Sequence, residues 1–332
     1  MDRRTHAWIA VRAIALLEDE GKNESLVRLL KPRAQHAAVG AWIPDLGDAK
    51  RGGSKTENHI LKIKPLPNGD RYFVVKKDEL LSRLGSYRAM ADLIEVDVGL
   101  DKAWWNTPYK GDIRMPGQHL ANRAMAMSTM NIDLLIMGDN AVDLLLPGTV
   151  DFAPELAGDA RTRIDQVSLY FFILSHFVAD SCMPCHCDAR KLSTYSKGLH
   201  NKLEKHWSGL VGNAFDDDEL DAGGYSSSEL LDRAREVDAR FDIHFRQNHV
   251  PRIKAKDIWV ETINVCRASF ALASMIAPPG SYPYDDDSLK APYNQVLGTG
   301  NPALSAQIDK AVMHDAVLNV AMVWKDVWKD AE

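Results

Sequence analysis

The side chains best suited to chemistry fall in one stretch that reads H-x3-D-x5-H-x13-H-x3-E. Its members are His176, Asp180, His186, His200 and Glu204. The first two and the last two are each four positions apart, a spacing that puts both side chains of a pair on one face of a helix. Imidazole together with carboxylate is the ligand set of zinc, whereas calcium and magnesium prefer oxygen ligands. The stretch therefore predicts a zinc site.

Each pair also has an ordinary structural interpretation. His176 lies in an apolar helical segment, where Asp180 could simply satisfy a buried histidine. His200 and Glu204 fit a solvated surface ion pair, which contributes little to stability. What favours a metal site is the coincidence of two such pairs with a third histidine, His186, between them.

The elements that must position these residues are mostly helices. Apolar residues recur at helical spacing in eight segments. These segments are 8–17, 78–95, 117–138, 161–181, 197–210, 227–245, 257–276 and 303–329. Alternation typical of strands appears mainly around residues 60–75, where Pro-Asn-Gly-Asp at 67–70 is a turn signal. The sequence thus predicts one all-α, multi-helix domain over residues 1–332 with a small β-hairpin.

Composition limits the class of protein. The chain has 332 residues, of which 45% are hydrophobic and 26% charged, as in globular proteins and unlike disordered or collagen-like ones. Its formal net charge of −6 argues against a broad electrostatic grip on long nucleic acid. No apolar run reaches the length of about 18 residues that a membrane span needs. Since no signal sequence is recognisable, the chain is expected to be cytoplasmic, or secreted if a signal was removed before residue 1.

The zinc-ligand stretch resembles a known family. Together with residues 198–204, it is similar to the metal-binding core of the bacterial zinc-dependent phospholipases C, which are related in fold to the zinc-dependent single-strand nucleases. Residues 5–14 resemble the first metal-binding helix of those phospholipases. Asp45 and His59, separated by thirteen residues, match the family's Asp and His.

The resemblance implies an all-helical domain of the phospholipase C and nuclease type, with three zinc ions. By analogy the first ion would be held by Asp45, His59, His176 and Asp180. The second would be held by His186, His200 and Glu204. The third would be held by His6, the bridging Asp180, and the amine and carbonyl of Met1. The resemblance also implies that zinc activates a water for in-line attack on phosphorus, with Asp45 orienting or deprotonating that water.

Two departures from the family bear on the substrate. Leu46 and Thr56 stand where the phospholipases have aromatic residues that help to recognise choline, so a choline preference is not supported. The chain between the ligands His59 and His176 is longer than in the phospholipases. We therefore interpret residues 61–130, which contain most of the predicted hairpin, as a family-atypical insertion that could cover the site.

The cysteines are not needed for this ligand set. Cys182, Cys185 and Cys187 surround His186, and as thiolates they could compete for zinc. Because the ligands implied by the resemblance are already complete, we expect these cysteines to be buried neutral thiols.

Three hypotheses on function follow. The first is a zinc-dependent phosphodiester hydrolase that resembles phospholipase C and acts on a phospholipid or another small phosphodiester. The second is a single-strand nuclease or nucleotidase of the related branch, which the short segment before His6 favours. The third is a non-catalytic, zinc-stabilised binding module, against which the complete ligand set and Asp45 argue. No stable protein partner can be inferred.

Overall fold

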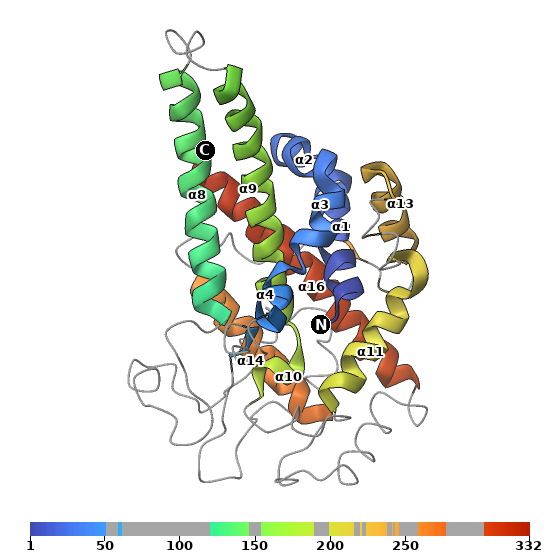
Figure 1. The fold of residues 1–332 in the computed structure, drawn as a ribbon. Coiled ribbons are helices and arrows are strands. Elements are labelled where there is room, and N and C mark those ends of the chain that lie inside the picture. Colours follow the sequence, from blue (N-terminus) through green and yellow to red (C-terminus); the bar gives the residue numbers. More distant parts are fainter. Residues whose placement is uncertain are drawn as a thin grey trace, which may run out of the picture.

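In the computed structural model, the described residues form thirteen helical elements and no strand (Figure 1). The described residues are 1–50, 59–61, 120–145, 154–188, 199–215, 220, 224–237, 241, 243–245, 258–276 and 302–332. The elements are α1 (Arg3–Glu20), α2 (Glu24–Leu30), η1 (Lys31–Arg33), α3 (Ala34–Gly40), α4 (Ile43–Lys50), α8 (Leu120–Leu145), α9 (Pro154–Ser181), α10 (Pro184–Cys187), α11 (Leu199–Val211), η3 (Gly212–Phe215), α13 (Ser227–Val237), α14 (Ile258–Ile276) and α16 (Pro302–Ala331). The predicted all-α class is confirmed for this part of the chain.

Helix α1 lies at the centre of the molecule. Every residue from Thr5 to Leu17 is buried, because the segment is apolar on nearly all sides and is surrounded by α3, α9, α13 and α16. Its start is capped by Asp2, whose carboxylate accepts a hydrogen bond from the Thr5 amide at 3.1 Å. Its end is capped by Gly21, whose φ of 67° lies in the left-handed region that favours glycine.

Three long helices pack against one another beside α1. Helices α8 and α9 lie side by side and α16 packs against both (Figure 1). Trp324 of α16 is fully buried and donates its indole N–H to the Phe171 carbonyl of α9 at 2.9 Å. The described helices share one hydrophobic core. The predicted zinc ligands on α1 and α9 are therefore held in place by close packing.

Most predicted helices are present, with one correction. Of the segment predicted as helix over residues 227–245, Ser227–Val237 is helical, whereas residues 241 and 243–245 are not. The predicted helix over 78–95 and nearly all of the predicted hairpin lie outside the described residues. Of the predicted insertion over 61–130, residues 120–130 form the beginning of α8, and residues 62–119 also lie outside the described part.

Among the described helices, none has the length and apolar composition that crossing a membrane requires.

Candidate metal centre

All nine residues predicted to bind zinc lie together in the structure. They come from the start of the chain (Met1), α1 (His6), α4 (Asp45), the short segment 59–61 (His59), α9 (His176 and Asp180), α10 (His186) and α11 (His200 and Glu204). The segment that carries His59 is held by two backbone hydrogen bonds. The Leu61 amide donates to the His186 carbonyl at 3.1 Å, and the Leu120 amide donates to the Ile60 carbonyl at 3.2 Å.

The first donor group consists of His59, His176 and Asp180, all buried. His59 Nδ1 lies 2.7 Å from His176 Nε2 and 3.3 Å from Asp180 Oδ2. His176 Nε2 lies 3.1 Å from the same Asp180 oxygen. At 2.6 Å, the other nitrogen of His176, Nδ1, contacts the Ala41 carbonyl, which can only accept a hydrogen bond. Nδ1 therefore carries a proton, which leaves Nε2 as the His176 nitrogen that could bind a metal.

The second donor group consists of His186, His200 and Glu204. The Nε2 atoms of the two histidines are 2.9 Å apart, and His200 Nε2 lies 3.0 Å from Glu204 Oε1. The side chains of His200 and Glu204 are 23% and 21% exposed, so this group is open to solvent on one side. Asp180 joins the two groups, because its Oδ1 atom lies 3.2 Å from His186 Nδ1.

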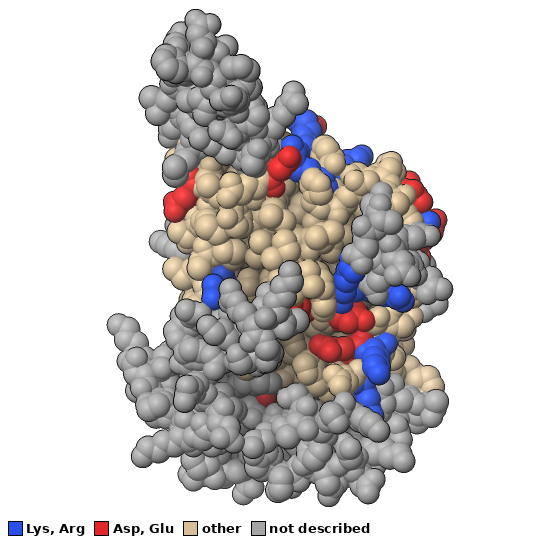
Figure 2. Space-filling view, viewed as in Figure 1, with Lys and Arg blue, Asp and Glu red and all other residues tan. Residues whose placement is uncertain are grey.

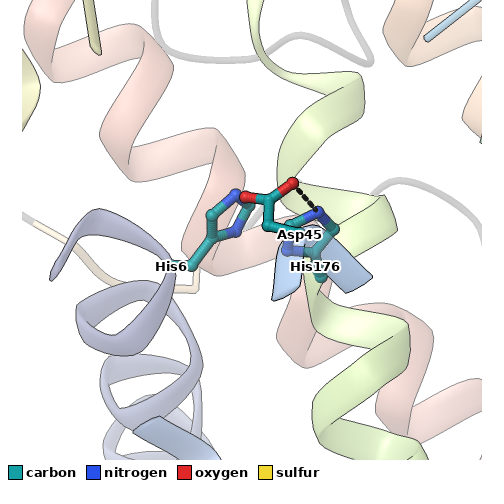
Figure 3. A group of neighbouring side chains, drawn as sticks. All are labelled: His6, Asp45 and His176. Atoms are coloured by element: carbon teal, nitrogen blue, oxygen red, sulfur yellow. Dashed lines mark ion pairs between the residues drawn. The ribbon is translucent and has the colours of Figure 1, made fainter. Parts of the chain in front are cut away.

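A third set of donors brings His6 and Asp45 to His176, from three different helices (Figure 3). The His6 ring stacks on the His176 ring with the centroids 4.0 Å apart. Asp45 Oδ1 lies 3.7 Å from His176 Nε2 and 3.6 Å from His59 Nδ1. The resemblance placed His6 with Asp180 and Met1 at a separate ion. In the structure His6 Nε2 does lie 3.4 Å from Asp180 Oδ1, but His6 is equally a neighbour of Asp45 and His176.

The amine of Met1 is buried between two carboxylates. It lies 3.2 Å from Asp180 Oδ1 and 3.2 Å from Glu204 Oε1. Burial disfavours its charge, but the carboxylates of Asp180, Glu204 and Asp45 outweigh burial and raise the pKa of the amine to about 11. Because an amine binds a metal only through its free electron pair, metal binding at Met1 would release a proton.

The protonation states around Asp180 suit a metal. Burial disfavours the charge of Asp180, yet His186, the Met1 amine and His176 hold the pKa of this carboxyl well below its ordinary value. Burial, with the amine and His200 adding to it, lowers the pKa of His186 to about 3 against the pull of Asp180. An ionised carboxylate and a neutral imidazole are the forms that coordinate metal.

Several buried nitrogens in the centre have no hydrogen-bond partner, which tests whether a metal fits. These atoms are His6 Nδ1, His6 Nε2 and His186 Nδ1. Buried polar atoms are almost always satisfied, so unpartnered nitrogens beside carboxylates require an explanation. A metal cation among these groups would account for one nitrogen of each ring, because it takes up the lone pair of a neutral imidazole, and it would also balance the carboxylate charges. The residues present therefore fit a metal centre.

Comparison with protein-family models, with curated proteins and with solved structures gives no match.

Charged side chains gather on the surface beside this centre. Figure 2 shows acidic and basic side chains together where α1 begins and next to α11, the helix that carries His200 and Glu204.

The four cysteines are buried and free of disulfides, and none belongs to a donor group of the described residues. Burial raises the pKa of Cys182 and of Cys266 above the ordinary thiol value. This confirms the expectation of buried neutral thiols for Cys182.

Two groups that contact the predicted ligands or their helices were not predicted from the sequence. The Ala41 carbonyl, which orients His176, is a backbone atom and has no sequence signature. Asp309 contacts His206 and Trp207 of α11 but lies about one hundred positions away in the chain. Only the buried position of Asp309 on a largely apolar helix face distinguishes it, and that signal does not reveal its partners.

Proposed function

We propose that this protein is a zinc-dependent phosphodiester hydrolase of the phospholipase C and single-strand nuclease type. The observation that carries the proposal is the pair of donor groups joined by Asp180, each made of two histidines and one carboxylate. Adjacent divalent cations can stabilise both the attacking and the leaving oxygen of a phosphoester. The all-α class of the described residues is in keeping with this fold type.

Zinc is the metal that best suits these donors. Three protein ligands per ion, with nitrogen in the majority, are typical of catalytic zinc sites, which keep a coordination position free for water or substrate. The partial exposure of Asp45, His200 and Glu204, between 21% and 29%, provides access to such a position. A purely structural zinc site would be closed by four protein ligands, so this exposure favours catalysis over a scaffold role.

When bound, zinc would act as a Lewis acid and lower the pKa of a coordinated water. We assign to Asp45 the role of the base that accepts a proton from the attacking water. Its Oδ1 atom faces His59 and His176, while its side chain remains 29% exposed. Burial, with the charge of Asp180 adding to it, raises the pKa of Asp45 against the opposing histidines, which makes this carboxylate a better base.

The bound zinc ions would also attract the phosphate of the substrate. Two or three zinc ions carry more positive charge than Asp45, Asp180 and Glu204 neutralise, so the centre would attract an anionic phosphodiester despite the acidic chain. Water would add to phosphorus, and the bond from phosphorus to the leaving alcohol oxygen would break. The substrate class that we propose is a small phosphodiester, either a phospholipid or a nucleotide chain.

The test is hydrolysis of bis-p-nitrophenyl phosphate by the purified full-length chain. We expect turnover that is lost on chelation and restored by zinc. The monoester p-nitrophenyl phosphate serves as the control substrate and should react far more slowly. Absence of chelator-sensitive hydrolysis would contradict the proposal, and a following panel of phospholipids and single-stranded nucleic acids would separate the two substrate sources.

A further inference from the structure

Asp309 lies outside the donor groups but binds the helix that carries two donors. It is a carboxylate on α16, and only 7% of the residue is exposed. Its Oδ1 atom accepts a hydrogen bond from Trp207 Nε1 at 3.1 Å and lies 2.8 Å from His206 Nε2. Both partners belong to α11, so a single oxygen atom ties α11 to α16.

The position of Trp207 on α11 relates this contact to the donors. Trp207 follows Glu204 by three positions and His200 by seven, so the three side chains lie along one stripe of the helix. The Trp207 indole is fully buried, and its only polar atom is bonded to Asp309. Rotation or sliding of α11 would break that bond, so the bond restrains the Glu204 carboxylate one turn away.

Helix α16 also contacts the helix that carries the other donors. Asn319 Nδ2 of α16 donates to Cys182 Sγ at 3.5 Å, two positions after Asp180. Asn319 is ten positions from Asp309, or about 15 Å along the helix axis. Helix α16 therefore connects α11 to the end of α9, and through them connects Glu204 to Asp180.

We propose that Asp309 is a positioning residue for the second donor group. By holding Trp207 and His206 it keeps His200 and Glu204 in register with Asp180, and so raises the affinity of that group for zinc. This inference rests on the proposed function, because it takes the donor groups as zinc sites. Polar residues that orient metal ligands commonly change metal affinity by about 10- to 100-fold when they are removed.

The experiment compares zinc affinity in three variants, measured by competition with a chromophoric chelator. Asp309→Leu removes the acceptor, and Trp207→Phe removes one donor while keeping an aromatic ring. Trp324→Phe is the matched control, because Trp324 is also fully buried and loses an indole hydrogen bond, but to the Phe171 carbonyl. We expect about tenfold weaker zinc binding in the first two variants and unchanged binding in the control. Asp309→Asn, which keeps an acceptor oxygen, should lie between wild type and Asp309→Leu.

A second background separates positioning from general destabilisation. In a His200→Gln variant the second donor group is already broken, so adding Asp309→Leu should not weaken the remaining zinc binding. Further weakening in that background, or equal loss in the Trp324→Phe control, would overturn the positioning role. If wild-type protein binds no zinc, the proposed function fails instead, and the two failures are thus distinguishable.

Discussion

His59 Nδ1 lies 2.7 Å from His176 Nε2, although 117 positions separate the two residues in the chain. Both nitrogens also lie within 3.3 Å of one oxygen of Asp180. Three potential ligand atoms from two segments are thus gathered by the fold before a metal ion binds. The two nitrogens are closer together than ligands of a tetrahedral zinc would be, so binding would require only that the side chains move slightly apart.

His176 belongs to two sets of donors, whereas His200 belongs to one. His176→Gln should therefore lower the zinc content of the purified protein more than His200→Gln does. Elemental analysis after dialysis against a weak chelator measures this difference. His36→Gln, which changes an exposed histidine of α3, is the control and should bind zinc like wild type. Equal zinc contents in the His176 and His200 variants would mean that the grouping is wrong.

Asp45→Asn should abolish turnover while leaving the fold and most of the zinc in place. The amide keeps an oxygen that faces His59 and His176 but cannot take a proton, so we expect the rate to fall about 100-fold or more. Hydrolysis of bis-p-nitrophenyl phosphate at matched zinc content measures the effect. Asp133→Asn, on the exposed face of α8, is the control. Full activity in the Asp45 variant would remove this residue from the role of base.

Stability of the zinc-free protein should fall as the pH falls from 7 to 5. The pKa of His186 is about 3 in the folded state and 6.5 ordinarily, so between these values the unfolded chain binds more protons than the folded chain. The free energy of unfolding then decreases with decreasing pH, by up to about 1.4 kcal/mol per pH unit for this one group. His6 acts in the same direction, because burial and His176 lower its pKa as well.

Urea denaturation of chelator-treated protein at pH 7 and pH 5 measures this dependence. His186→Gln should show a smaller change between the two pH values, since its amide does not titrate. His36→Gln should behave as wild type. An unaltered pH dependence in His186→Gln would show that this imidazole is not the group responsible.

One extra residue before Met1 should lower the zinc content. The Met1 amine is buried within 3.2 Å of Asp180 and Glu204, so an added residue would displace it from both carboxylates. Elemental analysis of the two chains makes the comparison, and an extra residue after the exposed Glu332 is the control. If the zinc content is the same in both, the amine is not a ligand.

Gly40→Ala should destabilise the protein and weaken zinc binding. A Cβ atom at Gly40 would lie 2.7 Å from Phe172 Cβ, closer than real Cβ contacts, so α3 would have to move away from α9. We expect a loss of about 1–3 kcal/mol. The movement would also shift the Ala41 carbonyl that orients His176. Gly209→Ala on α11 is the control, because open space surrounds that site and alanine should stabilise the helix by about 0.5–1 kcal/mol.

The sequence alone was sufficient to predict the donors that depend on helical periodicity. His176 with Asp180, and His200 with Glu204, pair within single helices, because four positions make about one helical turn. The long helices were predictable for the same local reason. The non-helical structure of residues 241 and 243–245 was not predictable in this way, because the apolar spacing of α13 continues into them.

Only the tertiary structure decided which donors meet across segments. It placed Asp45 beside both His59 and His176, put the His6 ring against His176, and brought Asp309 to α11. Such contacts depend on how all the helices pack around α1, and packing sums many weak interactions over the whole core. A local pattern of residue types carries no information on that sum. The types of ligand and their pairing within one helix could therefore be predicted from spacing, whereas their grouping across segments was implied only by the resemblance and depends on the tertiary structure.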